Sequence, residues 1–290
     1  MKLKITHIIT GLGTGGAEMM LYKLLQHTNQ AQFKSDVISL TGEGPHAKSI
    51  SEMGFSVKCL KLRPGVSLFT GAIKFWLHLR KTKPDIIQTW LYHADLLGGI
   101  IGRCVGVDYI CWGVRSSNLD SDKIKWTTLV VVKLCARLSK TVPNLIVCNS
   151  RKAKKYHQAI GYDMTKFFWI PNGFDTDLFY PNHRYRNQFR QKLGIKTSDF
   201  VIVHVGRYDL FKNHSGLLKA YAYTRKRFSN VHLICCGDEV NSQNLTLTKL
   251  IRELGIWIRL KGLLISGLFW MKLIRQLLFN RSLGGSILLQ

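Results

Sequence analysis

Short apolar runs alternate along the chain with longer segments in which apolar residues recur every three or four positions. An apolar run of about four to eight residues is typical of a buried strand, and the longer spacing is typical of a helix that covers it. Strands are predicted at residues 4–10, 36–40, 56–60, 85–89, 107–112, 144–148 and 167–170. Helices are predicted at residues 17–27, 46–53, 66–81, 94–105, 123–138 and 151–160. This alternation indicates βαβ units around one parallel sheet.

The alternation begins again after a polar stretch, residues 175–186, which we interpret as a connection between domains. Further strands are predicted at 200–205 and 231–236, and further helices at 215–228 and 245–254. We therefore expect an α/β fold with two Rossmann-like domains, over residues 1–174 and, incompletely, over residues 182–262. Residues 263–290 form an atypical tail that is basic and apolar and contains no acidic residue.

A glycine-rich loop, residues 11–16, follows the first predicted strand and leads into the first predicted helix. Glycines let the backbone approach an anion, and the free N–H groups of the first helical turn point at it. Gly11, Gly13 and Gly16 fit the dinucleotide fingerprint, but the second strand does not end in the acid that would hold a ribose. NAD is therefore disfavoured, and both a different nucleotide pocket and a structural turn remain open.

A second loop, residues 206–212, also connects a predicted strand to a predicted helix. Its Arg207 and Lys212 can converge on one anion, because arginine supplies a rigid fork and lysine a mobile charge. His93 follows the fourth predicted strand and is either structural or part of a site at the carboxyl edge of the sheet, where such sheets bind ligands. The histidines and cysteines lack metal-binding spacings, so we expect no metal site.

The chain carries 42 Lys and Arg against 17 Asp and Glu, a formal net charge of +25. This excess favours an anionic partner, such as nucleic acid, a membrane surface or a phosphorylated substrate. The basic residues are spread along the chain, which favours a solvated basic surface over a nucleic-acid groove. Neither a signal peptide nor an apolar stretch of about 18 residues is evident, so we expect a cytoplasmic protein.

Taken together, the segments 9–18, 88–99, 112–118, 147–150, 170–175 and 206–209 resemble glycosyltransferase family 4, the group 1 glycosyltransferases of GT-B fold. The resemblance implies two facing Rossmann domains, a nucleoside-diphosphate sugar as donor, and transfer with retention of anomeric configuration. It implies no further cofactor and no nucleic acid. The acceptor would be a glycan or a lipid-linked sugar of bacterial surface polysaccharide synthesis, reached at the anionic inner face of the plasma membrane.

The resemblance also implies roles for individual residues. His93 would contact the transferred sugar near the reacting carbon, while Arg207 and Lys212 would neutralise the departing nucleoside diphosphate. The implied substrate-binding residues are Gly15, Gly16, Asn172, Gly206 and Gly237.

The sequence departs from the family in its second domain. Family members carry two glutamates separated by seven residues, which hold the donor, and no two glutamates of this chain have that spacing. The tail indicates either a premature or frame-shifted end or a membrane-binding segment. We therefore expect a truncated transferase with very low or no turnover. A non-catalytic sugar-nucleotide-binding remnant and, with less support, a basic nucleic-acid-binding protein remain the alternatives.

Overall fold

The computed structural model describes residues 2–63, 66–116, 124–177 and 179–256. The chain divides into two compact units, Met1–Gly173 and Phe174–Gln290. The predicted tail, residues 263–290, lies outside the described residues. The structure therefore tests neither a premature or frame-shifted end nor a membrane-binding segment.

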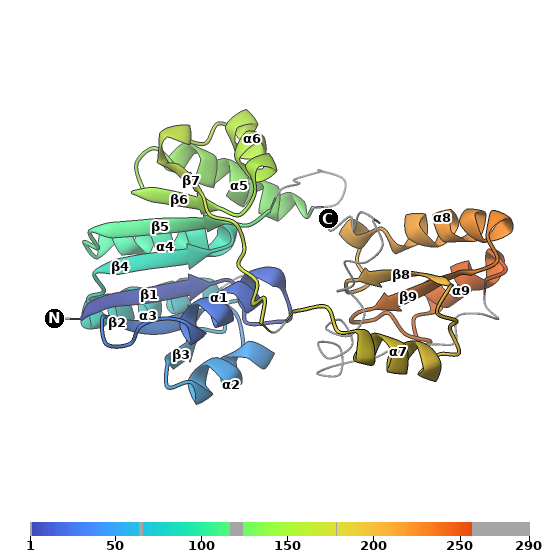
Figure 1. Ribbon diagram of the computed structural model, residues 1–290. Coiled ribbons are helices and arrows are strands. Elements are labelled where there is room, and N and C mark those ends of the chain that lie inside the picture. The colour runs from blue at the N-terminus through green and yellow to red at the C-terminus, as the bar shows by residue number, and fades with distance from the viewer. Residues whose placement is uncertain (1, 64–65, 117–123, 178, 257–290) are drawn as a thin grey trace. The chain divides into compact units, whose positions relative to one another are not determined.

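The first unit contains a parallel sheet of seven strands in the order β3-β2-β1-β4-β5-β6-β7 (Figure 1). The strands are β1 (Leu3–Ile9), β2 (Phe33–Ser39), β3 (Ser56–Cys59), β4 (Ile86–Trp90), β5 (Tyr109–Val114), β6 (Leu145–Cys148) and β7 (Phe167–Trp169). The chain runs outward from β1 to β3, then crosses to β4 and runs outward in the opposite direction. This doubly wound topology confirms the predicted α/β fold, and its switch point lies between β1 and β4.

Helices cover both faces of the sheet (Figure 1). On one face lie α1 (Gly16–Gln26) and α2 (Pro45–Glu52), and on the other lie α3 (Val66–Thr82), α4 (Tyr92–Cys104) and α5 (Trp126–Leu138). A further helix, α6 (Arg151–Ile160), packs near β6 and β7. Because successive strand residues point to opposite faces, Ile8 joins the core under α3–α5 while Ile9 joins the core under α1 and α2. Burial on both faces explains the continuous apolar runs in the sequence.

The second unit has a parallel pair, β8 (Phe200–Val205) and β9 (Val231–Cys236), with α7 (His183–Lys192), α8 (His214–Arg227) and α9 (Leu245–Glu253). The predicted connection over residues 175–186 is wrong at its end, because α7 begins inside it. The Asn182 side chain caps α7 by accepting a hydrogen bond from the Tyr185 N–H at 3.0 Å. Only Phe189 and Arg190 of α7 are buried, so this helix lacks the apolar period that would have predicted it.

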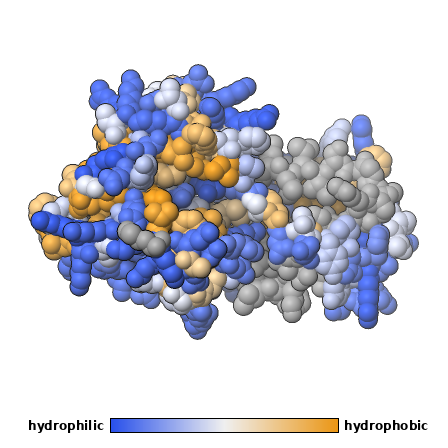
Figure 2. All heavy atoms as spheres, turned by 60° about the vertical axis from the view of Figure 1, so that its left-hand side comes forward, coloured by the Kyte–Doolittle hydropathy of each residue, from blue (hydrophilic) through white to orange (hydrophobic). Residues whose placement is uncertain are grey.

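On the face of the first unit that Figure 2 shows, hydrophobic side chains gather between hydrophilic ones. Among the helices that the structure describes, none is both long enough and apolar enough to cross a bilayer.

Gly113 in β5 has no room for a side chain, because an added Cβ would lie 2.4 Å from the backbone oxygen of Thr89 in β4. We expect Gly113→Ala to force these two strands apart and to lower the free energy of unfolding by about 1–3 kcal/mol. Gly16→Ala is the matched control, since its Cβ would meet nothing within 4 Å. Urea unfolding of both variants measures this, and equal midpoints would show that the sheet accommodates the methyl group.

Candidate functional site

The glycine-rich loop between β1 and α1 lies at the carboxyl end of β1, next to the switch point of the sheet. Its backbone is held by the loop after β2, where the Thr41 hydroxyl donates to the Thr10 carbonyl oxygen at 2.8 Å. Gly44 packs so closely that an added Cβ would lie 2.0 Å from the backbone oxygen of Leu12. The loop is therefore fixed by neighbouring backbone before any ligand arrives.

Two glycines of this loop, Gly13 and Gly16, face open space, and neither has a backbone conformation that requires glycine. The chain itself gives no steric reason for them, which is consistent with the approach of a ligand. Gly15 is the N-cap of α1 without a side-chain cap. An added Cβ there would lie 2.3 Å from a carboxylate oxygen of Glu18, so an anion at this helix start requires Glu18 to turn aside.

His93 lies in the first turn of α4, exposed at the carboxyl edge of β4. The preceding Leu91 has a φ of 75°, which is strained for a residue with a branched side chain. Its N–H donates to the Gly113 carbonyl oxygen at 3.2 Å, and its own carbonyl accepts from the Asp95 N–H at 2.9 Å. Desolvation lowers the pKa of His93, so the imidazole is neutral at pH 7 and can both donate and accept a hydrogen bond.

Asp95, two residues after His93 in α4, is fully buried. Its Oδ1 accepts from the Thr89 hydroxyl at 2.5 Å and from the Gly113 N–H at 3.2 Å, while its Oδ2 has no hydrogen-bond partner in the part of the chain that the structure describes. Burial raises the pKa of this carboxyl to about 7, although both hydrogen bonds and the charge of Arg115 act in the opposite direction. Asp95 therefore connects β4, β5 and α4 through its hydrogen bonds. Its carboxyl group changes its protonation state near neutral pH.

Arg115 directly follows β5 at the same edge. Its guanidinium carbon lies 4.5 Å from the ring centroid of Trp90, and its Nη1 donates to the Asn172 side-chain oxygen at 2.8 Å. Trp90 in turn donates from Nε1 to Nδ1 of the buried His7, at 3.5 Å. Burial lowers the pKa of His7 to about 4, which keeps this imidazole neutral and able to accept.

In the second unit, the loop between β8 and α8 lies against the loop after β9. The Gly206 N–H donates to the Cys236 carbonyl oxygen at 2.8 Å, and a Cβ added at Gly237 would lie 1.9 Å from the Gly206 oxygen. The Lys212 side chain folds back over Gly206, because a Cβ there would lie 3.2 Å from its Cγ and Cδ. The structure thus brings Gly206, Lys212 and Gly237 together at one strand end.

Arg207, in the same loop, forms an ion pair with Asp209 at 3.2 Å between Nη2 and Oδ2. The Arg207 side chain is 59% exposed, so this pair contributes little to stability. Asp209 also accepts from the Phe211 N–H at 2.9 Å and thereby caps the short helical turn that carries Lys212. Arg207 therefore has a weak, largely exposed partner that an incoming anion can replace.

Two histidines lie beneath this loop, His204 at the end of β8 and His214 at the start of α8. Their rings meet edge to face with centroids 4.7 Å apart, and the His214 ring is also 5.4 Å from Tyr208. Desolvation lowers the pKa of both histidines, and the nearby charge of Lys212 lowers them further. Neutral rings here leave the positive charge of the loop to Arg207 and Lys212.

The predicted site residues therefore fall into two sets, one in each unit. Gly15, Gly16, His93 and Asn172 belong to the carboxyl edge of the first sheet, although Asn172 lies after β7 and contacts Arg115. No role was expected from the sequence for Arg115, Trp90, Asp95 or Asp209. Position alone was a signal for Arg115, which directly follows a strand as His93 nearly does, but its contacts to Trp90 and Asn172 span long sequence separations.

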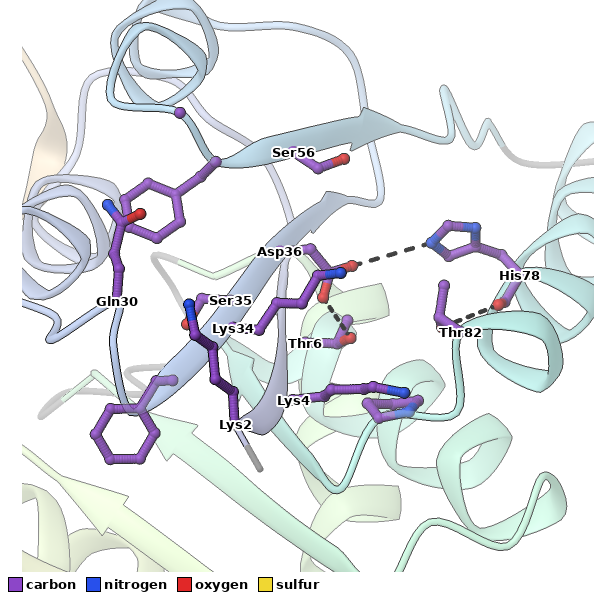
Figure 3. Close-up of a pocket in the computed structure, with 14 residues that line it drawn as sticks. Lys2, Lys4, Thr6, Gln30, Lys34, Ser35, Asp36, Ser56, His78 and Thr82 are labelled. Atoms are coloured by element: carbon purple, nitrogen blue, oxygen red, sulfur yellow. Dashed lines mark hydrogen bonds and ion pairs between the residues drawn. The ribbon is translucent and has the colours of Figure 1, made fainter.

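A cavity of about 750 Å³ lies at the opposite edge of the first sheet, where β1 and β2 begin (Figure 3). Lys4 and Lys34 line it, and Asp36 points into it (Figure 3). The Asp36 carboxylate accepts from the Thr6 hydroxyl at 2.7 Å and lies 4.0 Å from Nε2 of His78. Because this cavity lies at the amino ends of the strands, it is not part of the candidate site at the carboxyl edge.

Comparison with known families places this fold and these loops in a class. The model described as Glycosyltransferase Family 4 matches residues 14–178, more than half of the chain. The model described as Glycosyl transferases group 1 follows it over residues 185–263. The chain belongs to glycosyltransferase family 4, which confirms the resemblance seen in the sequence.

Two curated relatives are glycosyltransferases by name. EpsF of Bacillus subtilis, named as a glycosyltransferase, is 22% identical over 247 residues, which cover 81% of this chain and 62% of EpsF. The UDP-Gal:alpha-D-GlcNAc-diphosphoundecaprenol alpha-1,3-galactosyltransferase of Escherichia coli is 29% identical over 151 residues, 52% of this chain and 39% of the relative. The chain thus spans less than two thirds of the length of either relative.

Solved structures share the fold. HepE of Anabaena in complex with UDP-glucose superposes with a TM-score of 0.75 at 19% identity, over 94% of this chain and 72% of HepE. Sucrose-phosphate synthase from Thermosynechococcus elongatus gives a TM-score of 0.67 at 16% identity, over 94% and 72% of the two chains. At these identities the likeness shows the fold alone, which is of GT-B type as expected.

The buried Asp95 predicts a pH dependence of stability. Its folded pKa of about 7 lies above an unfolded value of about 3.9, so between these pH values the folded chain binds a proton that the unfolded chain does not. The contribution of Asp95 to the free energy of unfolding is therefore largest at low pH and decreases as the pH rises toward 7. We expect the free energy of unfolding of Asp95→Asn to rise by about 1–3 kcal/mol relative to that of the natural chain as the pH increases from 5 to 8.

Urea unfolding of the natural chain and of Asp95→Asn across this pH range measures the difference. Asp108→Asn, at an exposed position of the same unit, is the control and should show no such trend. A difference that stays constant with pH would mean that Asp95 does not titrate in this range.

Proposed function

We propose that this chain binds a nucleoside-diphosphate sugar and transfers the sugar, with retention of anomeric configuration, to a glycan or lipid-linked acceptor of surface polysaccharide synthesis. The carrying observation is the loop after β8 in a member of glycosyltransferase family 4, where the Lys212 side chain lies over Gly206 and the next residue is Arg207. Two cations at the carboxyl end of a strand suit a diphosphate whose charge increases as it leaves. The proposal involves no metal and no further cofactor.

Uridine is the proposed base of the donor. HepE was crystallised with UDP-glucose, and the Escherichia coli relative is named for UDP-Gal. The same relative is named for an acceptor carried on diphosphoundecaprenol, which supports a lipid-linked acceptor here. In the first unit, the neutral His93 is proposed to hold a hydroxyl of the transferred sugar, and Gly16 to leave room for the substrate.

Turnover by the 290-residue chain is proposed to be very slow. Neither of the two family glutamates that hold the donor can be identified, because no two glutamates here are separated by seven residues. The contacts proposed for Arg207 and Lys212 with the diphosphate do not involve those glutamates. Binding without turnover is therefore the alternative that the same loop supports.

Titration calorimetry with UDP-sugars and GDP-sugars tests the donor site. We expect UDP-galactose or UDP-glucose to bind, and Lys212→Gln to weaken binding roughly tenfold, because a charge-assisted hydrogen bond to phosphate is lost. Lys219→Gln is the matched control, since Lys219 is an exposed lysine in α8 outside the loop. Assays of sugar transfer to a lipid-linked acceptor measure turnover separately.

If Lys212→Gln and Lys219→Gln lose the same amount of affinity for the UDP-sugar, the loop after β8 is not part of the donor site. Absence of nucleotide binding, together with tight and salt-dependent binding of DNA or RNA, would replace the proposal with a nucleic-acid-binding function.

Contact with the anionic inner face of the plasma membrane is proposed through the outer faces of α3 and α5, which both pack against α4. On α3, Phe69, Ile73 and Leu77 are exposed at intervals of four residues, and α5 exposes Trp126, Val130 and Leu134 in the same way. Lysine and arginine are interspersed on both helices, and neither contains an acidic residue. Apolar residues among cations suit an anionic bilayer, whereas a second copy of this basic chain would be repelled.

Sedimentation with vesicles tests this face. We expect the protein to bind phosphatidylglycerol vesicles more tightly than phosphatidylcholine vesicles, and the double variant Phe69→Ser, Trp126→Ser to bind several-fold more weakly. Leu245→Ser is the control, because Leu245 is 80% exposed on α9 of the second unit. If Leu245→Ser reduces binding as strongly as the double variant, the membrane contact does not involve α3 and α5.

A further inference from the structure

We propose that Arg115 forms a phosphate-binding site in the first unit, which takes the diphosphate of a lipid-linked acceptor. The inference rests on the proposed function for the identity of the ligand, but the geometry of Arg115 stands by itself. The site belongs to the first unit, whereas the loop after β8, which is assigned to the donor, belongs to the second.

Arg115 is held in place before any ligand binds. Its guanidinium stacks on Trp90, 4.5 Å from the ring centroid, and Trp90 is itself buried and bonded to His7. Asn172 accepts from Nη1 at 2.8 Å, which fixes the rotation of the guanidinium. An arginine restrained on two sides loses little conformational entropy when it binds an anion.

These contacts do not neutralise the positive charge of Arg115. Asn172 is a neutral amide, and the Trp90 ring is uncharged. Asp95 is the nearby acid, but its Oδ1 is taken by Thr89 and Gly113, and its Oδ2 has no hydrogen-bond partner among the described residues. The Nε of Arg115 is likewise buried, and no described residue accepts a hydrogen bond from it. A buried N–H of a cation without an acceptor is costly, and an anion that reaches it removes this cost.

The position of Arg115 selects the kind of anion. It follows β5 at the carboxyl edge of the sheet, one strand from β4 and His93, where open α/β sheets bind ligands. A guanidinium fork pairs with two oxygens of one phosphate, which a lone lysine cannot do. Asn172, which the sequence marked as substrate-binding, then acts as a positioning residue that directs Arg115.

The test uses two probes, octyl N-acetylglucosaminyl diphosphate and octyl N-acetylglucosaminide, titrated in the presence of saturating UDP. We expect Arg115→Gln to weaken binding of the diphosphate probe roughly tenfold or more while the probe without phosphate binds as before. Arg115→Lys should bind the diphosphate probe more weakly than the natural chain and more tightly than Arg115→Gln, because lysine keeps the charge but lacks the guanidinium fork. Asn172→Ala should weaken the diphosphate probe less than Arg115→Gln does.

Arg80→Gln is the matched control, because Arg80 also stacks on a tryptophan, with its guanidinium 5.0 Å from the Trp76 ring, but lies in the last turn of α3. Thermal unfolding of every variant shows whether the fold is retained, and Arg115→Lys and Asn172→Ala keep the test valid if Arg115→Gln unfolds. Equal effects of Arg80→Gln and Arg115→Gln, or no binding of the diphosphate probe to the natural chain, would overturn the inference.

The two proposals fail in different ways. Absence of UDP binding and of sugar transfer, with a diphosphate probe that still depends on Arg115, would overturn the transferase proposal alone. If UDP binds normally and the diphosphate probe binds equally well to the natural chain and to the Arg115 variants, only the site at Arg115 is overturned.

Discussion

Parallel pairing of β1 with β4 is the constraint on which the rest of the first unit depends. Because the chain reverses its direction of winding there, the connections on either side of the pair leave the carboxyl edge in opposite directions, which is where open α/β sheets bind ligands. The glycine-rich loop follows β1, His93 follows β4, and Arg115 follows the next strand. A sheet with antiparallel strands would place these segments at alternating edges, and none of the proposed chemistry could gather.

Burial beneath this edge determines which groups carry charge. Desolvation favours the neutral forms of His7 and, up to a pH of about 7, of Asp95, whereas Arg115 keeps its proton under all ordinary conditions. The edge of the first unit is therefore cationic although an aspartate lies directly below it. In the second unit, two neutral histidines under the Lys212 loop have the same consequence. Both units present positive charge over a neutral support, which is the arrangement that phosphate recognition needs.

Most elements could be predicted from the sequence because both faces of a parallel sheet are buried. Strands such as β6, Leu145–Cys148, are continuous apolar runs, and helices such as α6, Arg151–Ile160, have buried residues four apart and clear ends. The helix α7 escaped prediction because its two buried residues, Phe189 and Arg190, are adjacent in the chain and set no helical period. Asp95 and Arg115 escaped attention as site residues because their partners, Gly113 and Asn172, are far away in the chain.

By itself, the sequence determined the family, the alternation of strands and helices, and the two loops that carry glycines and cations, since each is a local pattern of a few adjacent residues. Only the tertiary structure decided which of those residues meet. It placed Glu18 against Gly15, Asp209 on Arg207, and Arg115 between Trp90 and Asn172. The physical reason is that desolvation and hydrogen-bond satisfaction depend on atoms from several strands at once, and no local pattern contains that information.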